Sequence, residues 1–365
     1  MKFTPLIESL PSTTPFVGPE ALERRSGAAI KARIGANESV FGPAPSVITA
    51  MQAHAHEAWM YGDPENHDLK QALAAHLNVP AENIAIGEGI DGLFGYAVRM
   101  FVEQGISVAT SLGAYPTFNF HVAGFGGKLV TTPYAQDRED PTSLLALASK
   151  EKARVIYFAN PDNPMGTVWP AAEVQRFIDV VPDNVMLMLD EAYSEFALAN
   201  TPPALDVARK NVLRFRTFSK AYGLAGARVG YVIGHADVIK AFDKIRNHFG
   251  IARLSQIAAI AALKDQNWLR HVVESVRTSR LRIYNIAKAN GLKPIDSATN
   301  FVAIDCGRDG AFAKSVVDGL LKHGIFVRMP GVEPLNRCIR ISCGTSEHLD
   351  LLAHALPKVL ASTAK

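Results

Sequence analysis

The chain has 365 residues, a hydrophobic content of 48%, a charged content of 20% and a formal net charge of +3. These values describe an ordinary globular protein that is long enough for two domains, and they exclude a disordered or fibrous chain. The net charge is too small to indicate nucleic acid or a membrane surface as a partner.

The cysteines and the first residues bear on the compartment. Cys306, Cys338 and Cys343 are few and odd in number, which favours a reducing compartment over a disulfide framework. The first eight residues carry a proline and an acid where a signal peptide needs an apolar run. No uncharged window approaches the length of a membrane span, so we expect a cytoplasmic protein. The eleven histidines show no metal-ligand spacing, and no metal site is predicted.

From the start to about residue 41 the chain is rich in proline and serine and then basic, which predicts an arm and one short strand. Residues 46–58 and 66–77 have helical apolar spacing. Beyond residue 83, short apolar segments alternate with helical patterns such as residues 93–102 and 171–180. The apolar segments are residues 84–86, 107–109, 128–131, 155–159, 185–189, 212–217 and 229–233. This alternation predicts an α/β fold, in which helices sandwich a mostly parallel seven-stranded sheet and the ligand binds beyond the strands' carboxyl ends.

The character of the sequence changes after residue 235. Helical runs at residues 237–249, 256–263 and 268–290 precede candidate strands at 301–305, 324–328 and 338–342 and a closing helix. We predict a smaller α+β domain formed from both termini. The predicted organisation is residues 1–42 as an arm and part of the small domain, 43–250 as the large cofactor-binding domain, and 251–365 as the small C-terminal domain.

Residues 217–228 are the most informative stretch, because they place Lys220 on a glycine-containing turn after a predicted strand. A lysine amine becomes a nucleophile toward carbonyl groups when its pKa is lowered, and its best-known partner is pyridoxal phosphate. A single lysine in a loop is usually a surface residue. The functional interpretation therefore depends on two other stretches, one with Asp190 after a buried strand and one with Asn163 in an Asn-Pro-Met-Gly turn.

In this order and spacing the three stretches resemble the fold-type-I pyridoxal-phosphate aminotransferases, and within them the histidinol-phosphate aminotransferase branch. The resemblance extends from about residue 34 to residue 345. It implies a pyridoxal-phosphate-dependent transaminase of amino-acid biosynthesis that forms a homodimer with shared active sites. Its small-molecule partners would be an amino donor and a 2-oxo acid. Met165 departs from the family's motif, which usually has threonine there.

The chemistry of the cofactor suggests a role for each candidate residue. A buried carboxylate keeps a pyridine nitrogen protonated, and Asp190 is placed to do this; a turn aspartate is the alternative. Through the resemblance, Tyr193 and Asn163 bond the cofactor's phenolic oxygen, and Tyr61 reaches the phosphate from the partner subunit. The remaining candidates are Arg228, Thr217, Ser219, Gly89, Ile90 and Asp91 for the phosphate, and Tyr115, or otherwise Phe118, for stacking on the ring.

Three residues are expected to bind the substrate: Arg340, Arg328 and Asn37. In the histidinol-phosphate branch the arginine that matches Arg340 holds a phosphate, assisted by a second arginine and a tyrosine of the N-terminal arm. This chain has Phe16 where that tyrosine is expected, so one phosphate contact is lost. Histidinol phosphate is the favoured donor, with a 2-oxo acid such as 2-oxoglutarate as acceptor. The alternatives are an aromatic amino acid aminotransferase and a threonine-phosphate-type decarboxylase.

Two other classes of protein fit the sequence less well. Residues 87–92 match G-x-G-x-x-G between a strand and a helix, which is also a fingerprint of NAD-dependent dehydrogenases. That fingerprint needs an acid about twenty residues further on, and residues 105–136 contain no Asp or Glu. A ligand-sensing domain without activity would need an additional module, for which the chain has no spare length.

Overall fold

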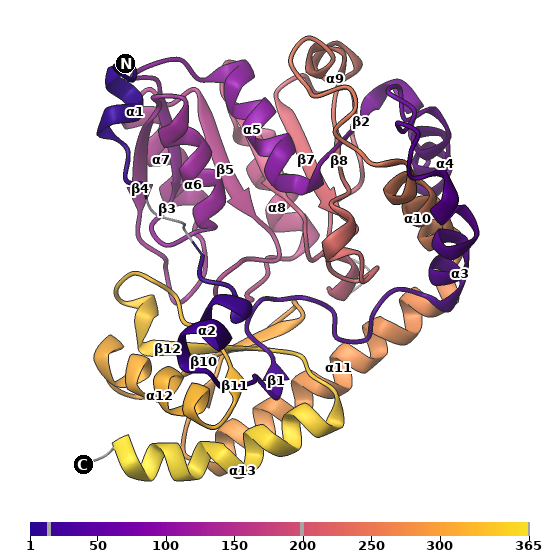
Figure 1. Ribbon diagram of the computed structural model, residues 1–365. Coiled ribbons are helices and arrows are strands. Elements are labelled where there is room, and N and C mark those ends of the chain that lie inside the picture. Colours follow the sequence, from indigo (N-terminus) through magenta and orange to yellow (C-terminus); the bar gives the residue numbers. More distant parts are fainter. Residues whose placement is uncertain (13–15, 198–200, 364–365) are drawn as a thin grey trace.

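The computed structural model describes residues 1–12, 16–197 and 201–363. Its centre is a seven-stranded sheet with the order β2-β8-β7-β6-β5-β3-β4 (Figure 1). The strands are β2 (Ile84–Gly87), β3 (Ser107–Ser111), β4 (Lys128–Thr132), β5 (Val155–Ala159), β6 (Met186–Asp190), β7 (Val212–Thr217) and β8 (Gly230–Ile233). β8 is antiparallel to both of its neighbours, and the other strand pairs are parallel. The predicted α/β fold with a mostly parallel sheet is confirmed.

Helices cover both faces of this sheet, which explains the consecutive apolar residues of its central strands. Along β5, Tyr157 packs toward α5 (Gly89–Phe101) and α6 (Pro116–Gly124), and Phe158 packs toward α7 (Pro141–Lys150) and α8 (Ala171–Val180). The ring of Tyr157 stacks on Phe118 at 4.3 Å, and Phe158 meets Phe177 edge to face at 5.2 Å. Because neither face meets water, the strand gains from apolar side chains at every position.

A third group of helices covers the β2 and β8 edge of the sheet. It comprises α3 (Pro45–His54), α4 (His67–Leu77), α10 (Arg253–Lys264) and the short turn η1 (Ala55–Glu57), with α9 (Ala236–Phe242) beside β2. Leu69 and Leu73 of α4 and Ala258 and Ala259 of α10 join one buried apolar cluster with β2 and β8. Helices that precede the large sheet in the sequence and a helix that follows it therefore pack against the same edge of the sheet.

A smaller α+β layer lies below the large sheet in Figure 1 and is reached by the long helix α11 (Gln266–Ala289). Its antiparallel sheet has the order β12-β10-β9, formed by Cys338–Ser342, Phe301–Asp305 and Lys293–Pro294. The helices α12 (Gly310–Lys322), α13 (Ser346–Thr363) and α2 (Pro19–Ser26) complete the layer. β1 (Ala32–Arg33) pairs in parallel with β11 (Ile325–Phe326), so both ends of the chain contribute. The exact domain limits stay predictions.

The helix expected over residues 237–249 is wrong in its second half. α9 ends at Phe242, and residues 243–250 form turns. The helical hydrogen-bond pattern stops at Asn247, whose N–H donates to the Tyr96 hydroxyl at 3.0 Å instead of to a carbonyl oxygen one turn back. The Arg246 side chain also makes a distant contact, since its Nη2 donates to the Pro64 carbonyl at 2.8 Å. Helical spacing alone did not reveal these contacts.

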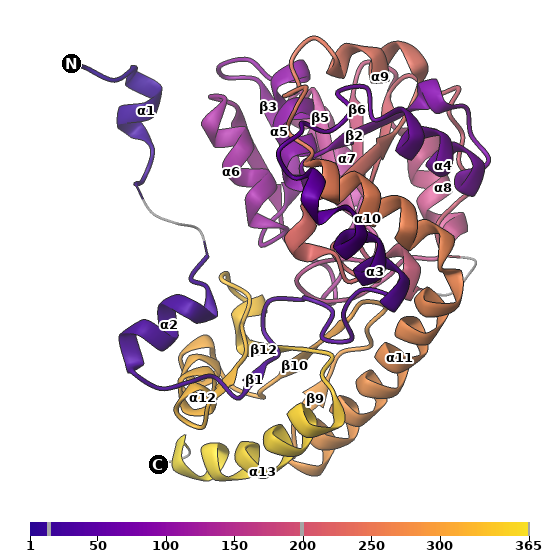
Figure 2. The same ribbon diagram turned by 45° about the vertical axis from the view of Figure 1, so that its right-hand side comes forward.

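The N-terminal helix α1 (Pro5–Ser9) has no buried residue and lies apart from the body of the molecule (Figure 2). It fits the predicted arm. Among the residues that the structure describes, no helix combines the length and the apolar composition that a membrane crossing requires.

Candidate active site

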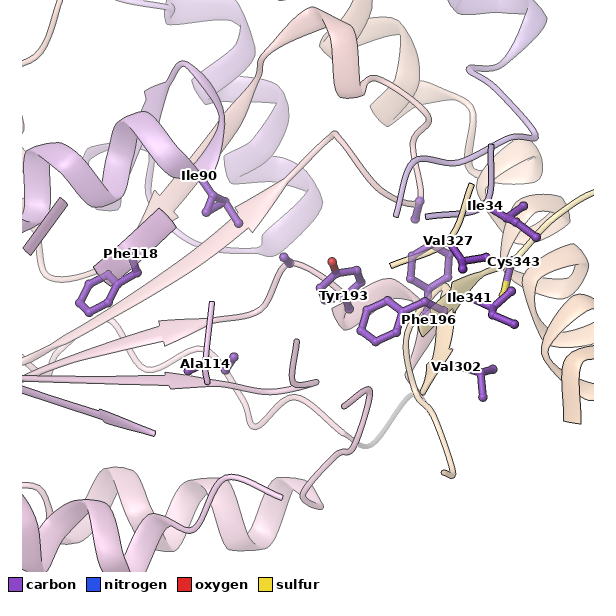
Figure 3. Packing of buried hydrophobic residues seen from close by; sticks show 14 of the residues in the cluster. Ile34, Ile90, Ala114, Phe118, Tyr193, Phe196, Val302, Val327, Ile341 and Cys343 are labelled. Atoms are coloured by element: carbon purple, nitrogen blue, oxygen red, sulfur yellow. The ribbon is translucent and has the colours of Figure 1, made fainter. Parts of the chain in front are cut away.

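The carboxyl ends of β5, β6 and β7 meet at one edge of the large sheet, where most predicted site residues lie. Ala159 pairs with Asp190, and Asp190 pairs with Phe215, so these strand ends are level. The small layer faces this edge and contributes Asn37 and Arg340. Figure 3 shows Tyr193 between the apolar residues of the large sheet and those of the small layer. The candidate site therefore lies between the two layers.

Lys220 lies in the turn that follows β7 and points toward the small layer. Its Nζ donates a hydrogen bond to the Asn37 carbonyl oxygen at 3.2 Å and lies 5.6 Å from the centroid of the Tyr193 ring. Burial lowers the pKa of Lys220 to about 8, and the positive charges of Arg340 and Arg228 act in the same direction. An amine with this pKa is a much better nucleophile at neutral pH than a surface lysine.

Asp190 ends β6 with a buried carboxyl group. The Tyr157 hydroxyl donates to its Oδ2 at 2.7 Å, and the Ala192 N–H donates to Oδ1 at 2.9 Å. Burial raises the pKa of Asp190 to about 6, although both hydrogen bonds favour the ionised form. A carboxylate that is costly to bury is stabilised by a cationic ligand group beside it.

Asn37 connects the lysine to the small layer. Its backbone has the left-handed φ of 58°. Its Nδ2 donates to the Tyr193 hydroxyl at 3.1 Å, and the Ser342 hydroxyl donates to its Oδ1 at 3.0 Å. Asn300 Nδ2 donates to the same Asn37 carbonyl that Lys220 contacts, at 3.0 Å. These bonds fix the positions of the Lys220 amine and the Tyr193 hydroxyl relative to each other.

A small cationic cup lies between Arg228 and the start of α5. Arg228 Nη1 donates to the Ser219 hydroxyl at 3.3 Å. Gly89 has a positive φ, and a β-carbon there would overlap the Arg228 guanidinium group, so the close approach requires glycine. α5 begins at Gly89 with its first N–H groups, including those of Ile90 and Asp91, at the helix N-terminus. The cup has the charge and the donors that a phosphate group needs.

The hydroxyl groups of Ser219 and Thr217 have different hydrogen-bond partners. The Ser219 hydroxyl faces Arg228, whereas the Thr217 hydroxyl donates to the Val229 carbonyl at 3.4 Å and accepts from the Ser219 N–H at 3.0 Å. The Thr217 side chain therefore shapes the turn that carries Lys220, rather than facing the cup.

The structure distinguishes the two aromatic residues proposed for stacking. Phe118 is fully buried and stacks on Tyr157 in the apolar core between the large sheet and its covering helices. Tyr115 lies on the site side, where its hydroxyl donates to Asp91 Oδ1 at 2.9 Å. Asp91 Oδ2 in turn lies 3.7 Å from Arg228 Nη2. This geometry favours Tyr115 over Phe118 as the residue beside a bound ring.

Arg340 and Arg328 lie side by side through backbone hydrogen bonds in both directions. Arg340 Nη1 donates to Asn163 Oδ1 at 2.6 Å, and its buried Nε has no hydrogen-bond partner within the described residues. Burial lowers the pKa of Arg340 to about 10. The Arg328 guanidinium lies 5.0 Å from the centroid of the Phe16 ring. The Arg340 Nε–H is therefore available to donate a hydrogen bond to a bound molecule.

Arg228 keeps 48% of its side chain exposed. Tyr61 is the other predicted site residue that the single chain leaves on its surface. Its side chain is 77% exposed, and its ring lies 4.8 Å from that of Phe249. Sequence reasoning also missed three polar residues that complete the site: Tyr157, Asn300 and Ser342. The only signal for Tyr157 was a hydroxyl in an otherwise apolar strand, and the other two gave none.

These features are those of a pyridoxal-phosphate enzyme: a reactive amine, a buried carboxylate that favours a cation beside it, and a glycine-lined cationic cup. Pyridoxal phosphate has an aldehyde, a basic ring nitrogen and a phosphate, and each matches one of them. The chain belongs to the class I and II aminotransferase family, whose model matches residues 29–356.

Known relatives agree with this assignment. The chain is 31% identical to the histidinol-phosphate aminotransferase of Moorella thermoacetica, covering 97% of this chain and 92% of that protein. It is 33% identical to histidinol-phosphate aminotransferase 2 of Carboxydothermus hydrogenoformans, covering 93% and 94%. The crystal structure of histidinol-phosphate aminotransferase from Sinorhizobium meliloti, in complex with pyridoxal-5'-phosphate, is 58% identical and superposes with a TM-score of 0.97. The superposition covers 99% of this chain and 98% of the Sinorhizobium meliloti chain.

Proposed function

We propose that this aminotransferase takes the amino group of histidinol phosphate and passes it to a 2-oxo acid such as 2-oxoglutarate. The observation that carries the proposal is the pair of neighbouring arginines, Arg340 and Arg328, opposite Lys220. Two guanidinium groups, one with an unpaired N–H, suit a doubly charged phosphate. The proposal is also supported by the names of the relatives reported above.

Each residue of the site has a chemical task in this proposal. When bound, pyridoxal phosphate supplies an aldehyde that reacts with amines and a ring that takes up electrons from a broken Cα–H bond. The Lys220 amine would accept the proton from the substrate Cα and return it as a general acid. Asp190 would hold the positive charge of the ring nitrogen. The remaining tasks fall to Tyr193 and Asn163 at the phenolic oxygen, and to Arg228, Ser219, Ile90 and Asp91 at the phosphate.

A second donor class has one observation in its favour. The ring of Phe16 covers Arg328 at 5.0 Å and has no hydroxyl to offer a phosphate. An apolar cover over the arginine suits an aromatic amino acid. The threonine-phosphate-type decarboxylase alternative is tested by the same experiment described next.

The test is a panel of amines mixed singly with the protein loaded with pyridoxal phosphate. Histidinol phosphate, phosphothreonine, phenylalanine and tyrosine would be compared by the rate at which the absorbance of the bound cofactor changes to that of pyridoxamine phosphate. We expect histidinol phosphate to react fastest. Faster reaction with the aromatic amino acids would replace the proposed donor, and carbon dioxide release from phosphothreonine would replace the reaction type.

Changing Arg340 to alanine is expected to raise the KM for histidinol phosphate by about 10- to 150-fold, since a charge-assisted contact contributes about 1.5–3 kcal/mol. Steady-state kinetics with the wild-type protein and the variant would measure it. The matched control is Arg277→Ala on α11, an exposed arginine paired with Glu274. An unaltered KM in Arg340→Ala would remove this residue from the substrate site.

We further propose a homodimer in which Tyr61 reaches the phosphate of the partner subunit. Its exposed position is consistent with an interface role, since its ring lies 4.8 Å from that of Phe249, which is also exposed. Tyr61→Phe is expected to weaken cofactor binding about 2- to 10-fold through the loss of one hydrogen bond, with the sedimentation coefficient unchanged. A fully active monomer at the assay concentration would contradict the shared site.

We propose that the protein is located in the cytoplasm, because its three cysteines are free thiols. Cys306, Cys338 and Cys343 are all buried and unbonded to one another. Burial raises the pKa of each thiol, which keeps it in the unreactive protonated form. Reduced, inert thiols suit a reducing compartment.

A further inference from the structure

Glu191 directly follows Asp190, yet its side chain lies on the opposite face of the large sheet. β6 ends at Asp190, whose carboxyl group accepts a hydrogen bond from the Tyr157 hydroxyl. The Glu191 carboxylate instead contacts two arginines of β7, Arg214 and Arg216. Successive side chains of an extended chain point to opposite faces, which accounts for this division. None of the roles proposed above uses Glu191 or either arginine.

Three hydrogen bonds join the Glu191 carboxylate to β7. Arg214 Nε donates to Glu191 Oε1 at 3.1 Å, and Arg214 Nη2 donates to the same oxygen. Arg216 Nε donates to Oε2 at 2.8 Å. The side chains of Glu191, Arg214 and Arg216 are only 1%, 4% and 13% exposed. These three residues therefore form a buried ion triad, in which both carboxylate oxygens have a partner.

The buried ion triad is also fixed on the side away from the site. Arg214 Nη1 donates to the Ala204 carbonyl at 2.8 Å, and Arg214 Nη2 donates to the Pro203 carbonyl at 2.9 Å. Burial by itself would raise the pKa of Glu191, but the charges of Arg214 and Arg216 outweigh it and hold that pKa below its ordinary value. Glu191 is therefore ionised at neutral pH.

Net stability is a weak reason for a chain to keep such a triad. Moving charged groups out of water costs about as much free energy as their attraction returns, so well-packed apolar side chains are often as stable in the same place. The surroundings here are apolar, since Leu187, Leu189 and Val212 form a buried cluster on the same face. The triad adds direction instead, because a guanidinium group holds a carboxylate in a defined geometry.

The triad joins the two strand ends that carry the proposed catalytic groups. In the parallel pairing of β6 with β7, Asp190 lies opposite Phe215, so Glu191 lies one position beyond the last pair and level with Arg216. The Glu191 N–H donates to the Phe215 carbonyl at 2.9 Å. Lys220 follows Arg216 by four positions. A shift of Glu191 along the sheet therefore moves Asp190 relative to the turn that carries Lys220.

The residues after Glu191 depend on the same anchor. The Ala192 N–H donates to Asp190 Oδ1 at 2.9 Å, and the Ser194 N–H donates to the Glu191 carbonyl at 3.1 Å. The turn formed by these bonds also carries Tyr193. One short segment, fixed to β7 by its second residue, thus places both the Asp190 carboxyl group and the Tyr193 ring.

We propose that Glu191 is a positioning residue of this aminotransferase: the buried ion triad holds the Asp190 carboxylate in place relative to the Lys220 amine. This inference rests on the proposed roles of Asp190 and Lys220 at the cofactor. Two groups that act on one ring must keep a fixed separation, and a displacement of about 1 Å can lower a rate about 10²-fold. Glu191 faces away from the site, so it acts through its neighbours.

The test is Glu191→Gln, which keeps the size of the side chain and removes its charge. One measurement is steady-state kinetics with histidinol phosphate and 2-oxoglutarate. The other is the nitrogen NMR shift of the ring nitrogen in the protein loaded with isotope-labelled pyridoxal phosphate. We expect the kcat to fall about 10- to 100-fold, with the KM for histidinol phosphate unchanged because Arg340 belongs to the small layer. The NMR signal should move toward that of the unprotonated ring, since a displaced Asp190 no longer holds the proton.

Glu173→Gln is the matched control. Glu173 lies on α8 and forms an exposed ion pair with Arg176. Its loss removes the same charge from the surface of the same layer, so both the kcat and the ring-nitrogen signal should stay at their wild-type values.

A double variant separates position from charge. Glu191→Gln alone leaves a net positive charge in the triad, which also disfavours a proton on the ring nitrogen through space. Adding Arg216→Gln restores the net charge of the wild-type triad but not the tie between the strands. We expect the low kcat and the moved signal to persist in the double variant. Recovery of both would mean that the triad acts by its charge alone, and the positioning role would be wrong.

Should Glu191→Gln fail to fold, Arg216→Lys replaces it. Lysine keeps the positive charge but cannot reproduce the fixed geometry of the Arg216 Nε–H bond. The kcat should then fall about 3- to 10-fold, as expected for the loss of one hydrogen bond, and the NMR signal should move in the same direction. A ring-nitrogen signal that stays at the wild-type position in the folded variant overturns the inference, whatever the kcat.

Failure of this inference can be told apart from failure of the proposed function. The NMR measurement needs no amine, so it decides the positioning role even if histidinol phosphate proves not to be the donor. Loss of activity in Asp190→Asn together with a wild-type signal in Glu191→Gln overturns the positioning role alone. A wild-type ring-nitrogen signal in Asp190→Asn overturns the role of Asp190, and this inference with it.

Discussion

A variant in which Lys220 is changed to alanine is expected to bind pyridoxal phosphate without a covalent link and to lose its transaminase activity. The Lys220 amine is buried beside Tyr193 and Asn37, with a pKa of about 8. At pH 7 about a tenth of such amines are neutral, compared with fewer than about one in a thousand for an ordinary lysine. The site therefore maintains a reactive amine that alanine cannot replace.

Two measurements separate the roles of this amine. Borohydride reduction followed by mass spectrometry should find the cofactor attached to residue 220 in the wild-type protein and unattached in the variant. The kcat should fall by about 10²- to 10⁴-fold from the loss of acid–base catalysis alone. Lys220→Arg keeps the positive charge but supplies no nucleophile, so it should fail in both assays.

The control for these variants is Lys240→Ala. Lys240 is an exposed lysine on α9, twenty positions after Lys220 in the chain. It should keep the covalent link and the wild-type kcat. Full activity in Lys220→Ala would end the assignment of the catalytic amine, whatever the other residues of the site do.

The large sheet could be predicted because burial on both faces leaves a strong local signal. β5 and β7 begin and end at the residues expected from their apolar runs. Asp190 and Lys220 follow from the same signal, since polar residues just beyond such runs fall at the carboxyl edge of a parallel sheet. These positions require no knowledge of distant parts of the chain.

The rest of the site could not be predicted because its contacts join distant parts of the chain. Asn37 bonds Ser342 across 305 positions and Asn300 across 263 positions. The choice between Tyr115 and Phe118 could not be made either, because Tyr115 precedes α6 while Phe118 lies within it, and residues 116–124 have no apolar periodicity that shows which side faces the sheet. Similarly, Asp162 in a proline-containing turn is typical of a surface loop, and only the fold buries its carboxylate, to which the Tyr134 hydroxyl donates at 2.8 Å.

Changing Asp190 to asparagine should separate catalysis from stability. Asparagine keeps the shape of the side chain and can still bond the Tyr157 hydroxyl, but it carries no negative charge to hold a proton on the ring nitrogen. Loss of a preorganised electrostatic group of this kind lowers kcat by about 10²- to 10³-fold. Asp183→Asn, an exposed residue in the turn before the same strand, is the control and should leave kcat unchanged.

The same substitution is expected to stabilise the protein without its cofactor. The pKa of Asp190 is about 6 in the folded protein, above the value of about 3.9 for an unfolded aspartate. A raised carboxyl pKa means that the folded state binds the proton more tightly, so stability falls as the pH rises from about 4 to 6. Above pH 6 the full cost, about 3 kcal/mol, is present, and asparagine removes it.

Thermal unfolding of the cofactor-free proteins should therefore give a higher Tm for Asp190→Asn than for the wild-type protein at pH 7 to 8, with the difference disappearing near pH 4. A Tm that does not rise, together with a normal kcat, would mean that the carboxyl group is an ordinary turn residue. A rise in Tm with a loss of kcat would show that the sequence keeps a costly buried charge because the ring nitrogen needs it.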